Sequence, residues 1–308
     1  MSLLPLKEGG HGMGATAIIG LGAMGLGMAR NILAAGIALT GYDIAPAARD
    51  RFASLGGTPA ETAAGAAEGA SLLLVMVVDA AQARAALFES GAARALEPGA
   101  TVILSSTVAP SDVRAIAAEL DGHGHLLLDA PVSGGQVGAE AGTLTVMASG
   151  PDAAFERAQA LLSAVSKKVH RLGSEPGTGA TYKVLHQLAA GVHLVAAAEY
   201  MALGARAGCD PRKLHEIVSS SAGQSWMADD RVPRMMEENP SITSTVDIFV
   251  KDLGLVLQAG RDVRAPLPLA AAAHQMLLAA SALGHGRDDD SAVVKAYEAL
   301  TGKPVRKA

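Results

Sequence analysis

The first half of this 308-residue chain alternates short, nearly continuous apolar runs with stretches of helical periodicity. Five apolar runs are predicted to be strands: Ala15–Leu21, Ile37–Tyr42, Ser71–Val78, Thr101–Ser105 and His125–Ala130. A strand that is apolar at successive positions is typically buried on both faces, as in a parallel sheet covered by helices. The repeated strand–helix–strand unit therefore predicts an α/β domain whose parallel sheet is doubly wound, with right-handed crossovers.

The pattern changes near residue 175, where strands become hard to find. Leu172 to Gly179 is loop-like, and Ala180 to Ala207 is predicted to be one long helix that Gly208 ends. Asp210 and Pro211 supply an N-cap and a first-turn proline for the next helix. Further helices are expected at about 225–238, 247–262, 267–283 and 290–301. We predict two domains, 1–175 and 176–308, the second all-α and joined to the first by the long interdomain helix.

Composition excludes several classes of protein. A net charge of −5 argues against a general nucleic-acid binder, because such a protein needs a basic face. The single cysteine, Cys209, excludes an internal disulfide and a Cys-based zinc site. Residues 1–13 lack the features of a signal peptide and are interpreted as a loose extension, and the apolar stretch Pro266 to Leu283 as a buried helix rather than a membrane span. We expect a soluble, cytoplasmic protein with no membrane partner.

A GxGxxG motif follows the first predicted strand and opens the first predicted helix; it comprises Gly20, Leu21, Gly22, Ala23, Met24 and Gly25. Gly20 permits a tight turn, Gly22 lets a pyrophosphate approach the backbone, and Gly25 lets the helix pack closely on the strand. The helix N-terminus then offers unpaired N–H groups to the phosphates. Asp43 ends the second strand 23 residues after Gly20, close to the spacing of an acid that binds the adenosine ribose. This context predicts a Rossmann-type dinucleotide-binding domain rather than a structural turn alone.

Asp43 also indicates which dinucleotide is bound. Its carboxylate would accept hydrogen bonds from the ribose hydroxyls and repel a 2′-phosphate, so NAD is favoured over NADP. Arg49 and Arg51 are interpreted as solvated helix charges. Val77 and Val78 close the next strand of the sheet and should face the nucleotide.

Thr107 follows the strand Thr101–Ser105 at its carboxyl end, the edge of an open α/β sheet at which ligands bind. The alternative role for Ser106, Thr107 or Ser111 is to cap the following helix, and capping is compatible with a cofactor contact.

Lys183, His186 and Gln187 stand at positions i, i+3 and i+4 of the long helix, so they share one face. The rest of this stretch is apolar, and a buried charge needs partners because an unpaired one is very costly. These side chains therefore predict either a functional site or a hydrogen-bond cluster that braces the domain junction.

No metal site is expected. His193 lies two turns after His186, but no further ligand stands at the spacing of a zinc motif, so His193 is interpreted as a core histidine or one that supports the site. The three acids Asp288, Asp289 and Asp290 precede a helical run and are interpreted as capping residues.

Four blocks, in order, resemble the signatures of the β-hydroxyacid dehydrogenase (3-hydroxyisobutyrate dehydrogenase-like) family. They are Gly20–Gly25 with Met28–Asn31; Asp129–Gly135 with Gly138-Ala139 and Gly142–Leu144; Gly177–Gly179 followed by Lys183; and Lys251–Gly254. The resemblance runs from about residue 15 to about residue 300. It implies an NAD-dependent oxidoreductase that acts on a small hydroxy acid in the cleft between the two domains.

The resemblance also implies roles for individual residues. Ser133, Gly134 and Gly135 would bind the substrate carboxylate, and Lys183 would be the catalytic acid–base group. Thr107 and Lys251 would lie beside the cofactor. Members of the family generally form dimers or tetramers, and the Ala-rich helical domain is a plausible dimer surface, so a homodimer or homotetramer is expected.

His186 and Gln187 stand where many members of the family have paired asparagines. Together with Ala222–Met227, Val246–Asp252 and Asp289–Val293, this departure resembles the members that oxidise L-threonate, a four-carbon sugar acid. His186 and Gln187 would then bind the additional hydroxyls of the substrate. The alternatives are another short hydroxy acid, such as 3-hydroxyisobutyrate, glycerate or tartronate semialdehyde, and a non-catalytic NAD-binding sensor. Lys183 argues against the sensor, which needs no cationic acid–base group.

Overall fold

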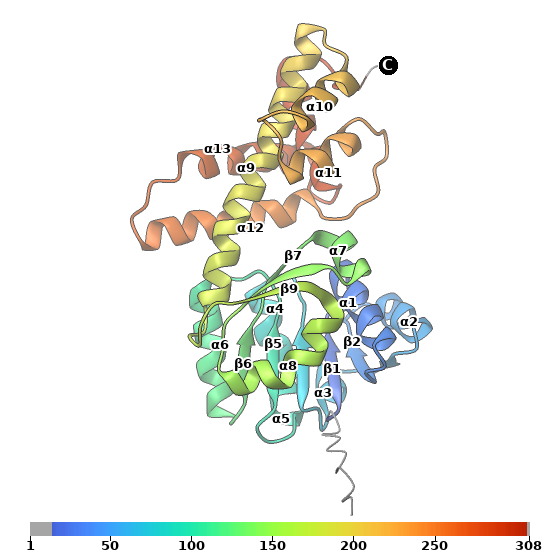
Figure 1. Ribbon diagram of the computed structural model, residues 1–308, viewed down its shortest axis with the longest axis vertical. Coiled ribbons are helices and arrows are strands. Elements are labelled where there is room, and N and C mark those ends of the chain that lie inside the picture. Colours follow the sequence, from blue (N-terminus) through green and yellow to red (C-terminus); the bar gives the residue numbers. More distant parts are fainter. Residues whose placement is uncertain (1–13, 307–308) are drawn as a thin grey trace, which may run out of the picture.

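The computed structural model describes residues 14–306, so the extension expected at residues 1–13 lies outside the described part. Six strands form a parallel sheet in the order β3-β2-β1-β4-β5-β6 (Figure 1). Their bounds are β1 Thr16–Ile19, β2 Leu39–Tyr42, β3 Thr58–Pro59, β4 Leu72–Val75, β5 Thr101–Leu104 and β6 Leu126–Asp129. The order reverses between β1 and β4, as in a doubly wound Rossmann-type sheet, so the predicted fold class is confirmed.

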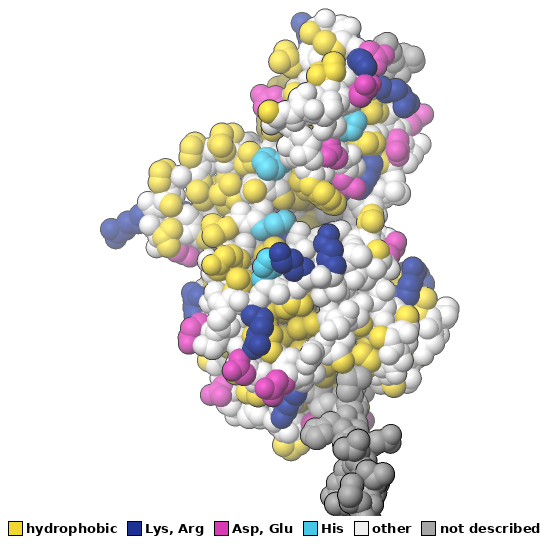
Figure 2. Space-filling view, viewed as in Figure 1, with side chains coloured by type: hydrophobic (Ala, Val, Ile, Leu, Met, Phe, Trp, Pro, Cys, Tyr) yellow, Lys and Arg dark blue, Asp and Glu magenta, His cyan; other side chains and the backbone are white. Residues whose placement is uncertain are grey.

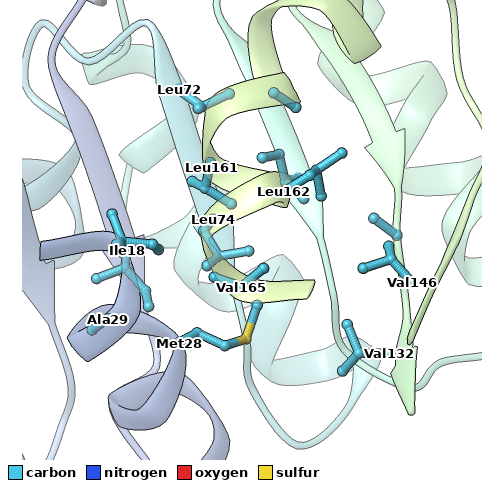
Figure 3. Packing of buried hydrophobic residues seen from close by; sticks show 14 of the residues in the cluster. Ile18, Met28, Ala29, Leu72, Leu74, Val132, Val146, Leu161, Leu162 and Val165 are labelled. Carbon is cyan, nitrogen blue, oxygen red and sulfur yellow. The ribbon is translucent and has the colours of Figure 1, made fainter. Parts of the chain in front are cut away.

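Helices cover both faces of this sheet because its side chains alternate between them. Ile18 and Leu74 point to the face covered by α1 and α8, where they pack with Met28 and Leu161 (Figure 3). Ala17, Leu73 and Val102 point to the opposite face, which α3, α5 and α6 cover. The helices of this domain are α1 Ala23–Ala34, α2 Pro46–Ser54, α3 Ala63–Ala67, α4 Ala80–Arg84, α5 Ala92–Ala95, α6 Pro110–Gly122, α7 Gly135–Ala141 and α8 Asp152–Val165, with a π-turn, η1, at Ala85–Glu89.

A second, three-stranded sheet was not predicted from the sequence. It consists of β7 Val132–Ser133, β8 Leu144–Ala148 and β9 Ser166–Arg171, in the order β7-β8-β9. β7 has only two residues, and β9 (SKKVHR) is polar because it is an edge strand with mostly exposed side chains. This sheet holds the segment around Ser133 above the carboxyl ends of the main strands (Figure 1).

The second half of the chain is helical, as predicted. The elements are α9 Thr178–Ala207, α10 Pro211–Ser219, α11 Trp226–Met235, α12 Val246–Asp262, α13 Pro268–Ala280 and α14 Val294–Thr301, with short turns η2 Ser281–His285 and η3 Asp290–Val293. α9 begins two residues before its predicted start and ends where Gly208 adopts a left-handed conformation, with φ of 82°. It runs from the α/β domain to the far end of the helical domain (Figure 1).

Within residues 14–306, α9 is the one helix long and apolar enough to cross a membrane by length and composition. Over half (56%) of its most apolar window is buried, and the helix packs against α10 to α14 of the helical domain and against β6, β8 and α6 of the α/β domain. It is packed as a core helix of the folded chain. The stretch 266–283, which the sequence singled out as most apolar, forms α13 and part of η2.

Candidate active site between the two domains

A cavity of about 1130 Å³ lies between the α/β domain and the helical domain. Its floor is the carboxyl edge of β1, β2 and β4, where the strand order reverses, and its other walls come from α7, α9, α11 and α12. Ligands of open α/β sheets bind at this switch point. Figure 2 shows Lys, Arg and His side chains gathered where the two domains meet.

The glycine-rich turn lines one half of this cavity, and each glycine has a distinct reason to be there. A Cβ on Gly20, whose φ is 95°, would lie 2.1 Å from the Met76 carbonyl oxygen, and one on Gly25 would lie 1.9 Å from that of Gly20. At Gly22 a Cβ would meet no described atom within 4 Å, so the space beside this residue is open. Among the described residues no side chain caps the α1 N-terminus. The turn thus fits a pyrophosphate group.

Asp43 stands at the end of β2, on the wall of the same half of the cavity. Its carboxylate accepts hydrogen bonds from the N–H groups of Leu21, at 2.7 Å, and Ala45, at 2.8 Å. Leu21 is itself fully buried, so it contributes this backbone bond rather than a cavity surface. Arg49 donates to the Asp43 carbonyl and to Glu61, and its side chain is only 16% exposed, so its interpretation as a solvated helix charge was wrong: it lies beside Asp43.

Val77, Val78 and Thr107 also line the cavity, at the ends of β4 and β5. The Val77 N–H donates to the Ser106 hydroxyl at 2.9 Å. The Thr107 carbonyl accepts a hydrogen bond of 2.8 Å from Lys251 of α12, which joins the two domains. The capping role considered for Ser106, Thr107 or Ser111 is wrong, since α6 starts after Ala109 and no side chain within 14–306 caps it.

Lys183 lies on α9 at the opposite wall, 6% exposed, with its ammonium group donating to Gln187 Oε1 at 2.8 Å. Burial lowers the pKa of Lys183 to about 8, against a raising effect from Asp252 and together with a smaller lowering effect from Lys251. Burial has this effect because it disfavours the charged form. A lysine with such a pKa exchanges a proton near neutral pH, which is what an acid–base catalyst requires.

His186 and Gln187 are on the same face of α9 as Lys183, as their spacing predicted. His186 Nδ1 lies 2.9 Å from Gln187 Oε1, and its Nε2 lies 3.0 Å from the Ser133 hydroxyl. Burial and the charge of Lys183 lower the pKa of His186, which favours the neutral ring. Because Gln187 Oε1 is an acceptor, we assign the proton to Nδ1, and Nε2 then accepts from Ser133. Gln187 is 6% exposed and its amide donates to Asp252 of α12, a bond within the helical domain, whereas the contact between His186 and Ser133 crosses the domain junction.

Ser133, Gly134 and Gly135 connect β7 to α7 and face the same part of the cavity. Gly134 and Gly135 have φ values of 130° and 61°, which L side chains rarely adopt. The chain therefore turns its backbone and the Ser133 hydroxyl toward His186.

Several residues at the cavity were not selected from the sequence. Asp252, 3% exposed, lies next to Lys251 and lines the wall beside Lys183. The sequence signal that could have identified Asp252 is an acid directly after Lys251 on an otherwise apolar helix face. Arg231 lines the cavity and forms a buried ion pair with Asp290, at 2.5 and 2.9 Å.

The structure changes the interpretation of His193 and of the acidic run that contains Asp289 and Asp290. His193 is exposed and lines the cavity, so it is not a core histidine, and the alternative that it supports the site stays a prediction. Asp289 caps η3 through the Ser291 N–H, as expected of this acidic run, whereas Asp290 is the ion-pair partner of Arg231. Within the described residues, no group of three His, Cys, Asp or Glu side chains is placed to hold a metal ion.

Two known families match the two parts of the chain separately, and both are described as NAD-binding. Residues 15–173 match the family described as the NAD-binding domain of 6-phosphogluconate dehydrogenase. Residues 177–297 match the NAD-binding family of NADP-dependent 3-hydroxyisobutyrate dehydrogenase. The predictions of an oxidoreductase and of a nicotinamide dinucleotide cofactor are confirmed, and the preference for NAD over NADP stays a prediction.

Individual relatives cover nearly the whole chain. An L-threonate dehydrogenase of Cupriavidus necator is 47% identical over 284 residues, 92% of this chain and 96% of the relative. An L-threonate dehydrogenase of Escherichia coli K12 is 46% identical over 286 residues, 92% and 95% of the two chains. The crystal structure of a 3-hydroxyisobutyrate dehydrogenase from Salmonella typhimurium has a TM-score of 0.87 at 45% identity, covering 91% of this chain and 99% of that one.

Proposed function

Since the chain belongs to the 3-hydroxyisobutyrate dehydrogenase-like family of NAD(P)-dependent hydroxy-acid dehydrogenases, we propose that it oxidises L-threonate to its 2-oxo product. The observation that carries the proposal is the position of Lys183. It is buried and lines the same interdomain cavity as the glycine-rich turn, His186 and Ser133, and its pKa is lowered to about 8.

Lys183 is the proposed acid–base group. In its neutral form the amine removes the proton of the substrate hydroxyl as the C–H bond breaks. When bound, the nicotinamide supplies the chemistry of accepting a hydride. In the reverse direction the Lys183 ammonium returns the proton to the forming hydroxyl oxygen. The negative charge of Asp252 stabilises the ammonium form and therefore raises the pKa of Lys183, against the effect of burial.

Substrate binding is assigned to two groups of residues. The Ser133 hydroxyl and the backbone at Gly134 and Gly135 hold the carboxylate, as oriented polar groups of this kind hold anions elsewhere. His186 and Gln187 bind the additional hydroxyls of the sugar acid. The His186 contact with Ser133 is at the cavity and can be exchanged for a substrate hydroxyl, whereas the bonds of Gln187 to Lys183 and Asp252 make it a residue that also orients the catalytic amine.

The cofactor contacts proposed from the sequence are Gly20–Gly25, Asp43, Val77, Val78, Thr107 and Lys251. NAD is the proposed cofactor. Asp43 presents a fixed carboxylate at the ribose position, and the neighbouring Ile44 is 82% exposed and offers no phosphate donor.

A second candidate function is oxidation of 3-hydroxyisobutyrate, which is favoured by the similarity to the 3-hydroxyisobutyrate dehydrogenase of Salmonella typhimurium. Glycerate or tartronate semialdehyde chemistry is a further alternative on the same site. NADH absorbance with a panel of L-threonate, 3-hydroxyisobutyrate and glycerate distinguishes them by kcat/KM. Turnover of none of these acids would leave the non-catalytic sensor as the better proposal.

We also infer the larger organisation from the exposed apolar side chains. Tyr182, Leu185 and Leu203 on α9 are more than half exposed, as are Val263 and Leu269 at the projecting end of α12 and α13, where Figure 2 shows hydrophobic side chains. Because exposed apolar surface of this kind is typically buried in an interface, these side chains support a homodimer or homotetramer, and sedimentation measures the number of subunits.

We propose residues 1–175 and 176–308 as the two domains and the cytoplasm as the compartment.

A further inference from the structure

A buried carboxylate outside the site described above holds the start of the catalytic helix. Asp129 ends β6 and is 1% exposed. Its Oδ2 accepts hydrogen bonds from the N–H groups of Gly177, at 3.1 Å, and Ala180, at 2.9 Å. These are donors of the first turn of α9, which a helix cannot satisfy internally. No side chain of the loop before α9 caps this helix in the described part of the chain. Asp129, 48 residues before Gly177 in the sequence, therefore acts as the cap.

Ser149 completes this arrangement from the end of β8. Its hydroxyl donates to Asp129 Oδ2 at 3.3 Å and accepts from the Gly179 N–H at 2.9 Å. The backbones of Asp129 and Ser149 also exchange two hydrogen bonds of 2.9 Å. A Cβ on Gly179 would lie 2.4 Å from the Met147 carbonyl oxygen, so the helix start is in close contact with the β8 backbone. Three N–H groups of one helical turn are thus fixed to the ends of two strands of different sheets.

Lys183 lies one turn beyond Ala180 on the same helix, so a shift of this first turn moves its amine relative to the cofactor half of the cavity. We propose that Asp129, in its ionised form and together with Ser149, is a positioning residue for Lys183. This proposal deepens the proposed function and rests on it. An anion at a helix N-terminus is stabilised by the helix dipole and makes hydrogen bonds about twice as strong as a neutral acceptor does.

The protonation state of Asp129 makes the proposal testable. Burial raises the pKa of Asp129 to about 6, against the lowering effect of its bonds to Ala180, Ser149, Gly177 and Gly179. The carboxylate is therefore ionised at pH 8 and mostly protonated at pH 5, where it resembles the neutral amide of Asn. Arg114 on α6 is a charged group next to these hydrogen bonds, because its guanidinium lies beside Gly177, and no charged side chain is among the causes of the raised pKa of Asp129.

The experiment compares Asp129→Asn with the unchanged protein from pH 5 to pH 8, by kcat, KM and NADH binding. Misplacement of a catalytic group by about 1 Å costs on the order of a hundredfold. We expect kcat to fall about tenfold to a hundredfold at pH 8, with the NADH Kd within twofold. The ratio of the parent kcat to the Asp129→Asn kcat should approach one as the pH falls through about 6, because Asp129 of the parent is then protonated. The titrations of Lys183 and His186 cancel in this ratio, because both proteins contain them.

A ratio that is the same at pH 5 and pH 8, or a kcat within twofold of the parent at pH 8, overturns the proposal. Asp210→Asn is the matched control, since it changes an N-cap carboxylate on α10, and it should leave kcat unchanged. If Asp129→Asn does not fold, Ser149→Ala provides the test. The Ser149 hydrogen bond lowers the pKa of Asp129, so its loss should move the second decline of kcat, near pH 6 and below the one that Lys183 causes, to higher pH. A second decline that does not move contradicts the proposal. Full turnover by Lys183→Ala would instead refute the proposed catalytic lysine.

Discussion

The two halves of the cavity are built in different ways. The cofactor half consists mostly of backbone. It comprises a glycine turn and the N-terminus of α1, which no side chain of the described residues caps. Its one carboxylate, Asp43, accepts a hydrogen bond from the Leu21 N–H of that turn. The substrate half is a network of side chains from α9, α12 and β7, in which Lys183, Gln187 and Asp252 share hydrogen bonds. The first half is fixed before any ligand binds. The second can change its hydrogen bonds and protonation, which is what chemistry and substrate choice require.

The largest expected effect separates turnover from cofactor binding. Replacing Lys183 with Ala should lower kcat by about a hundredfold to ten-thousandfold, the usual loss for a positioned acid–base group. The NADH Kd should change little, because the backbone half of the cavity is untouched. Stopped-flow turnover and NADH fluorescence titration measure the two quantities. A kcat within threefold of the parent would mean that the side-chain half does not hold the catalytic base.

The pH dependence of the two reaction directions should be opposite. Burial lowers the pKa of Lys183 to about 8, and oxidation needs the neutral amine. The rate of oxidation should therefore approach a roughly tenfold rise per pH unit between about pH 6.5 and pH 8, above the titration of Asp129, and level off above pH 8, while the reverse reaction declines above 8. Initial rates in both directions between pH 6.5 and 9.5 test this expectation. Parallel profiles in the two directions contradict it.

The same contrast explains how much could be predicted from the sequence. The glycine turn and Asp43 of the cofactor half are close together in the chain, and GxGxxG with Asp43 specifies a known geometry. In the substrate half, the spacing of Lys183, His186 and Gln187 predicted their shared helix face. The partners of that face could not be predicted from spacing, because Asp252 is 65 residues from Gln187 and Asp129 is 48 residues from Gly177. The β7-β8-β9 sheet was missed because β7 has only two residues and β9 is polar and mostly exposed, although β8 (LTVMA) does alternate between buried and partly buried positions.

Cofactor preference tests whether the backbone half depends on the charge at one position. Changing Asp43 to Asn and Ile44 to Arg removes a repulsive carboxylate and adds a phosphate donor. We expect the NAD to NADP ratio of kcat/KM to shift toward NADP by about tenfold or more, since a hydrogen bond to a charged group contributes about 1.5–3 kcal/mol. Asp50→Asn on α2, outside the cavity, is the control. An unchanged ratio would show that Asp43 does not contact the ribose.

Substrate preference has the smallest expected effect, and it tests the side-chain half most directly. A site built around polar groups rejects a ligand that lacks their partners, because each group left buried and unpaired costs roughly 1–3 kcal/mol. L-threonate should therefore be oxidised with a higher kcat/KM than 3-hydroxyisobutyrate. His186→Leu should lower kcat/KM for L-threonate several-fold more than for 3-hydroxyisobutyrate, since His186 has a hydrogen bond at the cavity that a substrate hydroxyl can replace.

Gln187→Leu should act in the same direction, with an added loss on both substrates because Gln187 also holds the Lys183 amine. The comparison requires kcat/KM for both acids on each variant, since discrimination is a difference between transition-state energies. Gln275→Leu, on an exposed part of α13, is the matched control. Equal losses on both acids for His186→Leu and Gln187→Leu would mean that this helix face only braces Lys183. The substrate assignment would then depend on similarity to the L-threonate dehydrogenases alone, and the carboxylate-binding turn at Ser133 would be the remaining place to look for discrimination.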